Sequence, residues 1–222
     1  MSLSVHSYET SESVAWDALV DESRNGTFLH TRRFLSYHGD RFNDASLVIR
    51  DKKQRLVGVF PAAIDPGVSD RIVSHPGITY GGIVHNGSLR GERMVEALAA
   101  ICAAYRNAGM RTLQYKVVPY IYHRFPSEDE LYALFRLGAH RCRCELSSTL
   151  DLENRLPFAR EKRQSIRQAE RNDLSVEEGP HLLAHSGWWW LNVWLDAIKR
   201  PQYTLYPRFS GSSRPSRQTS DA

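Results

Sequence analysis

The sequence has little sulfur, with only three cysteines and three methionines in 222 residues. The cysteines are Cys102, Cys142 and Cys144, an odd and sparse set that excludes a disulfide scaffold and indicates reduced thiols. Cys142 and Cys144 would point from the same face of a strand, but no second cysteine pair completes a zinc set. We therefore expect no metal site.

Long apolar runs are also missing, and none approaches the roughly 18 residues that a membrane-spanning helix needs. The N-terminus carries acidic residues and no basic region before an apolar segment, so it does not read as a signal peptide. These absences predict a cytoplasmic protein without a transmembrane segment.

Charge of one sign is not in large excess, since 29 lysines and arginines face 25 acidic residues and leave a formal charge of +4. Such a mild excess is compatible with an anionic small molecule but does not demand nucleic acid. No recognised DNA-binding motif is present, and we expect no DNA partner. The 41% hydrophobic content is ordinary for a soluble globular chain.

The first half of the chain predicts helices and a hairpin. Capping residues and apolar spacing favour a helix over Ser11–Glu22 and a short one over Thr31–Tyr37. Ser46–Ile49 and Leu56–Ile64 read as paired strands, with Pro61 bending or ending the second.

Strands and helices then alternate. The expected strands are Arg71–Ser74, Tyr80–His85, Arg111–Val118 and Arg141–Leu150, and the expected helices are 92–107, 127–138 and 157–172. We expect Leu131, Leu134 and Phe135 to form the buried face of the second of these helices. This order predicts an α/β fold, with a mixed sheet flanked by helices.

The character of the chain changes after Pro180. Four of the five tryptophans lie between Trp188 and Trp194, and the last sixteen residues are polar. We divide the chain into a first domain over residues 1–150, a basic helix and strand over 151–180, and an atypical segment over 181–222. Either the protein ends naturally here, or a frameshift or premature stop has replaced its continuation.

Several soft motifs occur in a suggestive order. Gly26-Thr27-Phe28-Leu29-His30-Thr31 is followed by Leu56-Val57-Gly58-Val59-Phe60-Pro61, by Ser74-His75-Pro76 with Tyr80-Gly81-Gly82, and by the basic helix 162–171. Together they resemble FemAB-like proteins of the GNAT superfamily, over roughly Ser11 to Glu178. The resemblance implies a GNAT-like fold and a second GNAT-like domain that is incomplete here.

The resemblance also implies a reaction, N-acyl transfer. FemAB-like proteins move an acyl or aminoacyl group from acyl-CoA or aminoacyl-tRNA to an amine of a cell-wall or surface-polysaccharide precursor. The implied partners are a nucleotide-linked sugar or peptidoglycan precursor, with tRNA as a further one, and no cofactor is bound permanently. Because that second domain is incomplete, the resemblance leaves open whether the chain is active alone.

The implied donor loop joins the strand ending at His85 to the helix starting at Glu92. Backbone amides at a helix N-terminus bind anions, and Gly87, Arg90 and Gly91 are the candidates for the donor phosphates. The loop lacks the full Arg/Gln-x-x-Gly-x-Gly/Ala pattern of GNAT enzymes, and Glu92 adds a negative charge. The alternative is a simple strand–helix connection.

Two arginine groups are candidates for phosphates of the acceptor. Their spacing puts one group on one side of the basic helix, whereas the other opens the second short helix. The residues are Arg160, Arg163, Arg167 and Arg171 in the first group, and Arg32 and Arg33 in the second. The alternative is that both groups are solvated surface charges.

Candidate catalytic residues follow the strand 111–118, because α/β folds tend to place ligands at strand ends. Lys116, Tyr120 and His123 could orient an amine or accept its proton. They could equally be packing or surface residues. The rival to an enzyme is a non-catalytic, degenerate GNAT module that binds an anionic sugar nucleotide or a partner chain.

Overall fold

A computed structural model describes residues 3–144, 146, 148–174 and 205–206. These residues belong to two units, one containing the chain up to Cys144 and the strand Leu205–Tyr206, the other the described residues from 146 to 174. The expected boundary at residue 150 falls inside the second unit, and nearly all of the expected segment 181–222 lies outside the described residues. No helix in the described part is long and apolar enough to cross a membrane.

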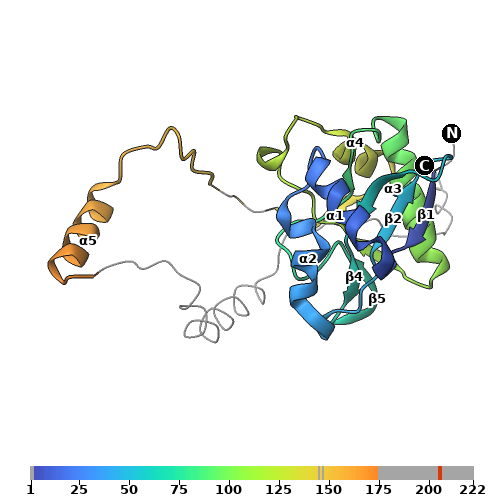
Figure 1. Cartoon of the computed structure of the whole chain (residues 1–222), viewed down its shortest axis with the longest axis horizontal. Coiled ribbons are helices and arrows are strands. Elements are labelled where there is room, and N and C mark those ends of the chain that lie inside the picture. The colour runs from blue at the N-terminus through green and yellow to red at the C-terminus, as the bar shows by residue number, and fades with distance from the viewer. Residues whose placement is uncertain (1–2, 145, 147, 175–204, 207–222) are drawn as a thin grey trace, which may run out of the picture. The chain divides into compact units, whose positions relative to one another are not determined.

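The first unit is an α/β structure with two main sheets (Figure 1). One has the order β1-β2-β3-β6 with antiparallel neighbours. The other has the order β4-β5-β7, in which β5 and β7 are parallel. The strands are β1 (Ser4–Ser7), β2 (Leu47–Arg50), β3 (Leu56–Phe60), β4 (Ala63–Asp65), β5 (Val68–Val73), β6 (Val84–His85) and β7 (Thr112–Gln114).

A further short pair joins β8 (His140–Arg141) to β9 (Leu205–Tyr206). The α-helices are α1 (Ser13–Glu22), α2 (Arg32–Leu35), α3 (Glu92–Asn107), α4 (Asp129–Arg136) and α5 (Arg160–Arg171), the last in the second unit. The 3₁₀ helices are η1 (Thr10–Glu12), η2 (Phe28–His30), η3 (Ser36–Arg41) and η4 (Tyr120–Tyr122).

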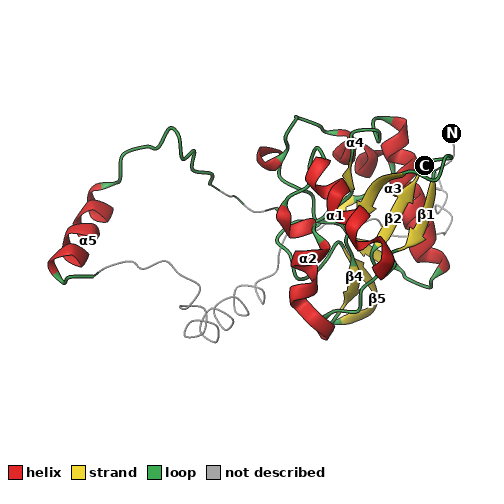
Figure 2. Cartoon of the chain, in the orientation of Figure 1, coloured by secondary structure: helices red, strands yellow, loops and turns green. Residues whose placement is uncertain are grey.

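Helices cover both faces of the four-stranded sheet (Figures 1 and 2). Trp16 of α1 packs with Val48 and Val59 of β2 and β3. On the other face, the α3 stripe packs against alternate residues such as Ile49 and Phe60. The stripe consists of Met94, Leu98, Ile101, Cys102 and Tyr105, all buried as expected. The predicted bounds of this helix are confirmed.

The predicted second strand of the hairpin is interrupted where proline stands. β3 ends at Phe60 and β4 begins at Ala63, so that Pro61 lies between two strands of different sheets. This agrees with the expected bend, because proline cannot donate to a strand ladder.

The expected buried face of α4 is wrong in part. Leu134 is buried, but Leu131 is 44% exposed and Phe135 is 79% exposed, while Glu130 and Ala133 are buried instead. The rotation of the helix follows from hydrogen bonds of Glu130 to the Tyr115 hydroxyl and to the Ile83 amide. A polar network has therefore set which face of α4 points inward.

Candidate functional site

A cavity of about 510 Å³ lies in the first unit, beside α1, α2 and η3. Asp17 of α1 holds α2 in place, because its Oδ1 accepts the Arg32 N–H at 2.5 Å. The Thr31 hydroxyl caps the same short helix by accepting the Phe34 N–H at 3.2 Å. Polar lining residues used below are Tyr8, Asp17, Arg32, Arg33, His38, Asp44 and His75.

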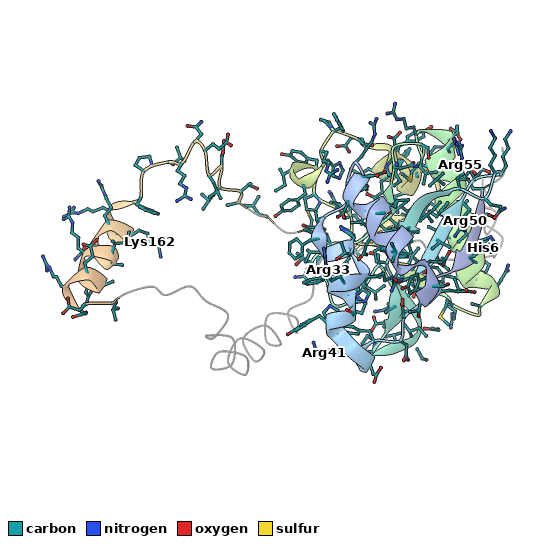
Figure 3. The ribbon with its side chains drawn as sticks, viewed as in Figure 1. His6, Arg33, Arg41, Arg50, Arg55 and Lys162 are labelled. Carbon is teal, nitrogen blue, oxygen red and sulfur yellow. The ribbon has the colours of Figure 1, made fainter. Side chains whose placement is uncertain are left out.

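The two predicted arginines of this region have different surroundings. The Arg32 guanidinium lies 3.4 Å from the ring centroid of Tyr8 and 4.1 Å from that of Trp16. Its Nη1 donates to Asp44 at 2.6 Å. Arg33 instead has an exposed side chain on α2, at the surface of the unit (Figure 3).

The electrostatics of Arg32 and Asp44 agree with that geometry. Burial lowers the pKa of Arg32, and the nearby Asp44 carboxylate opposes the change. Burial alone would raise the pKa of Asp44, but Arg32 and hydrogen bonds from Ser46 bring it below the usual value. Because Asp44 already balances Arg32, Arg33 is the better placed cation for a ligand.

His38 and His75 supply a neutral side of the cavity, with ring centroids 5.4 Å apart. Burial, followed by the charges of His38 and Lys116, lowers the pKa of His75 to about 3. The Gly77 N–H donates to His75 Nδ1 at 3.2 Å, so the neutral ring carries its proton on Nε2. His75 also has a φ of 57°, a left-handed conformation that is uncommon for a side chain of this size.

Lys116, a predicted catalytic residue, lies just after β7 and is only 3% exposed. Its ammonium group donates to the Ile78 carbonyl, and its N–H donates to Ser74 Oγ at 2.7 Å. Burial lowers its pKa to about 7. Its charge contributes to the lowered pKa values of both His30 and His75.

A second polar cluster surrounds His85 at the end of β6. Burial lowers the pKa of His85 to about 4; Asp129 opposes this, whereas Arg24, Arg90 and His123 reinforce it. The charges of the predicted donor-loop residue Arg90 and of the predicted catalytic residue His123 therefore both act on His85. Tyr120, the third catalytic candidate, is 73% exposed on η4.

The predicted donor loop already holds an anion from its own chain. Gly87 and Gly91 have φ values of 92° and 52°, and Gly91 is the N-cap of α3. The Gly91 N–H donates to Asp129 Oδ1 at 2.7 Å. Arg90 Nε donates to the Gly87 carbonyl at 3.1 Å. A bound phosphate would therefore meet the arginine side chains rather than this amide.

The outer edge of β6 is occupied by side chains instead of a neighbouring strand. Asn25 Nδ2 donates to the Ile83 carbonyl at 2.7 Å, and Asn25 Oδ1 accepts the His85 N–H at 3.3 Å. The Arg24 N–H donates to the His85 carbonyl at 3.2 Å. Sequence reasoning missed Asn25, because nothing local to the loop marks it as a partner of a strand some sixty residues later.

Glu130 completes this region and was also missed. Its carboxyl contacts the Tyr115 hydroxyl, and the Ile83 N–H donates to its Oε1 at 3.1 Å. Burial raises the pKa of Glu130 to about 8, against the opposing effect of these two hydrogen bonds. The group is therefore largely a neutral acid at pH 7.

We expect Glu130→Gln to make the protein more stable than wild type at pH 9. The folded-state pKa of Glu130 lies above the ordinary 4.5. The contribution of Glu130 to the stability of the wild-type fold is therefore full below pH 4.5 and is lost as the pH rises to about 8. Glutamine keeps a neutral, hydrogen-bonding group and does not ionise. Urea unfolding at pH 5 and pH 9 should show a gain of a few kcal/mol at pH 9 only. An equal effect at both pH values would contradict the raised pKa.

The predicted basic helix is present as α5, in the second unit. Arg160, Arg163, Arg167 and Arg171 are all exposed, as is Lys162 (Figure 3). The phosphate-binding role of these arginines stays a prediction. Among the described residues, no group of three or more histidine, cysteine or acidic side chains is placed to hold a metal ion.

No family model matches the chain, and no curated protein matches its sequence. Among solved structures, it is similar to the ribosomal-protein-S18-alanine N-acetyltransferase from Escherichia coli, with 14% identity over 69% of this chain and 87% of that one, at a TM-score of 0.48.

It is also similar to a GCN5-related N-acetyltransferase from Kribbella flavida, with 13% identity over 64% of this chain and 84% of that one, at a TM-score of 0.43. The ribosomal-protein-S5-alanine acetyltransferase from Vibrio fischeri has 14% identity over 64% of this chain and 81% of that one, at 0.42. At such identities and scores, the likeness assigns no donor, acceptor or functional residue.

Proposed function

We propose that this chain is an N-acyltransferase of the FemAB-like kind, which holds a phosphate-bearing amine acceptor in the cavity beside α2. The observation that carries the proposal is the exposed guanidinium of Arg33 at a cavity of about 510 Å³, next to a cation that Asp44 already neutralises. That volume is in the usual range of small-molecule sites. A nucleotide-linked sugar or peptidoglycan precursor is the acceptor class.

Arg33 and His75 divide the recognition of such an acceptor. An arginine fork suits phosphate oxygens and forms charge-assisted hydrogen bonds. His75, neutral with its proton on Nε2, offers a donor to a hydroxyl or carbonyl of the sugar. The arginines of α5 are further candidates for acceptor phosphates, or for those of tRNA if the donor is an aminoacyl-tRNA.

The reaction itself needs no covalent enzyme intermediate. The acceptor nitrogen attacks the acyl carbon, and the bond between the acyl carbon and the donor sulfur or oxygen breaks. The nitrogen then loses one proton to a base, and the leaving group gains one proton. His123 is our candidate base, because burial lowers its pKa and keeps it neutral at pH 7. Tyr120 lies three residues before His123 in the chain, and Lys116 acts by positioning. In the loop Gly87–Gly91, Arg90 is the main candidate for donor phosphates, because Asp129 accepts the Gly91 N–H.

A specific observation favours the second candidate, a non-catalytic module that binds a sugar nucleotide or a partner chain. Asp129 accepts the Gly91 N–H, and Asn25 and Glu130 occupy the edge of β6. These groups stand where the loop and strand would otherwise offer amides to a donor. A module of this kind keeps the cavity but binds no acyl-CoA.

The acceptor site is tested by titrating the full chain with UDP-N-acetylglucosamine in a calorimeter. We expect Arg33→Ala to weaken binding about tenfold or more, since one charge-assisted hydrogen bond contributes about 1.5–3 kcal/mol. Arg55→Ala is the matched control, because Arg55 is also an exposed arginine but lies in the turn between β2 and β3. Equal affinities of the two variants would refute the acceptor site.

A second titration separates the enzyme from the module. An enzyme should bind acetyl-CoA and release free thiol when an amine acceptor is present. The module should bind the sugar nucleotide alone. Arg90→Ala should weaken acetyl-CoA binding in the first case.

A further inference from the structure

Three aromatic rings form a column from the core of the first unit to its surface. The His30 ring is fully buried and lies 5.8 Å from the ring of Tyr80, at an interplanar angle of 39°. Tyr80, 8% exposed, stacks on Tyr122 with centroids 5.0 Å apart and an angle of 26°. Tyr122 is 47% exposed, so the column ends at solvent.

The lower part of the column is fixed by hydrogen bonds. The Thr27 N–H donates to His30 Nδ1 at 3.0 Å, and the His30 carbonyl accepts from Trp16 Nε1 at 2.8 Å. The Thr27 side chain also opposes the rise in the pKa of Tyr80 that burial causes. Tyr122 is positioned by η4, where its N–H donates to the Pro119 carbonyl at 3.0 Å. Because Tyr122 is already held in place, stacking of a ligand ring on it would cost the protein little conformational entropy.

Two arginines lie on the segments next to Tyr122, Arg124 along the chain and Arg24 across a main-chain hydrogen bond. Arg124 follows Tyr122 closely in the chain, and its N–H donates to the Arg24 carbonyl at 2.7 Å. The Arg24 guanidinium lies 5.3 Å from the ring centroid of Phe125, which is itself 59% exposed. The acidic residues of this stretch are Glu128 and Asp129. Asp129 already accepts a hydrogen bond from the Gly91 N–H.

We propose that the exposed face of Tyr122 is a stacking site for the base of a soluble nucleotide, whose phosphate meets Arg24 or Arg124. A planar base extends the column by one ring, and every base has a π-face that stacks on an aromatic side chain. The arginines favour a nucleotide over a neutral aromatic peptide, because only the nucleotide brings negative charge to them. This site is separate from the cavity, which contains neither Tyr122 nor Tyr80.

The test is calorimetric titration of the full chain with AMP, adenosine and ribose 5-phosphate. We expect AMP to bind more tightly than either of the two fragments, since only AMP supplies both ring and charge. Tyr122→Leu should weaken AMP binding about five- to a hundredfold, the effect of losing one base–aromatic stack. Tyr122→Phe should bind AMP as wild type does, because it keeps the ring.

Tyr120→Leu is the matched control, since Tyr120 belongs to the same 3₁₀ helix but not to the column. Arg33→Ala should leave the difference in affinity between AMP and ribose 5-phosphate unchanged, because that difference comes from the base at Tyr122 and not from a phosphate in the acceptor cavity. Three results would each overturn the stacking site: no saturable binding of AMP, equal losses in Tyr122→Leu and Tyr120→Leu, or equal affinity for AMP and ribose 5-phosphate.

Discussion

Lowering the pH from 7 to 4 is expected to unfold the first unit. His30, His75 and His85 are buried, and burial is the main reason why their pKa values fall to about 4, 3 and 4. The unfolded chain takes up these protons near pH 6.5. Neutral histidine therefore stabilises the fold above pH 6.5, and this stability is lost as the pH falls through the folded-state values.

The expected size of the effect is large for a protein domain. A difference of about 2.5 pH units for His30 or His85 corresponds to about 3 kcal/mol for each group. Glu130 opposes this loss. Its folded-state pKa is raised to about 8, so its contribution to the stability of the fold grows as the pH falls toward 4.5. One glutamate opposes the effect of three histidines. The net change in the free energy of unfolding therefore remains destabilising and is comparable to the whole stability of a typical domain.

Circular dichroism as a function of pH measures this transition. His85→Asn should shift the acid midpoint to lower pH, because it removes one buried group that must be protonated while leaving an acceptor for the Gly87 N–H. His6→Asn is the control, as His6 is an exposed residue of β1 (Figure 3). A wild-type protein that stays folded at pH 4 would contradict the neutral, buried state of these histidines.

Gly82→Ala is expected to cost several kcal/mol of stability. Gly82 has a φ of 92°, a region that residues with a Cβ rarely adopt. A Cβ there would collide with Glu130 Oε1 and come within 3.1 Å of the Tyr115 ring and hydroxyl. The substitution thus adds backbone strain and also breaks a buried hydrogen-bonded pair, two of the mechanisms that give large losses.

Gly138→Ala separates the two contributions to that loss. Gly138, just after α4, has a φ of 72°, but a Cβ there would meet nothing within 4 Å. It should lose only about 1 kcal/mol, from backbone strain alone. Urea unfolding of both variants measures the difference. Similar losses would mean that the contact of Gly82 with Glu130 and Tyr115 is unimportant.

The local sequence pattern was sufficient to predict elements that are long or that end at a residue such as proline. Helix α3 has a continuous apolar stripe, and its bounds could be predicted to the residue. The break at Pro61 was predictable because it depends on the chemistry of one residue. By contrast, β6 is only two residues long where a strand over Tyr80–His85 was expected, since its outer edge is bonded by side chains from distant parts of the chain.

The candidate site was harder to predict, for the same reason. Arg32 and Arg33 are indistinguishable in the sequence, and only the rings of Tyr8 and Trp16 make one of them a packed side chain. Glu130 reads as a helix-dipole residue at the start of α4, yet its partners are Tyr115 and Ile83. Contacts between distant segments therefore decide which charged groups remain available to a ligand.

Asn25 also has a consequence for how molecules of this protein meet one another. A strand edge with unpaired peptide groups is a template for a strand of another copy, and so for aggregation. By bonding Ile83 and His85 with one side-chain amide, the loop after α1 closes that edge within the monomer. The Asn25 side chain, together with the Arg24 N–H, thus takes the place of a capping strand at this edge of the sheet.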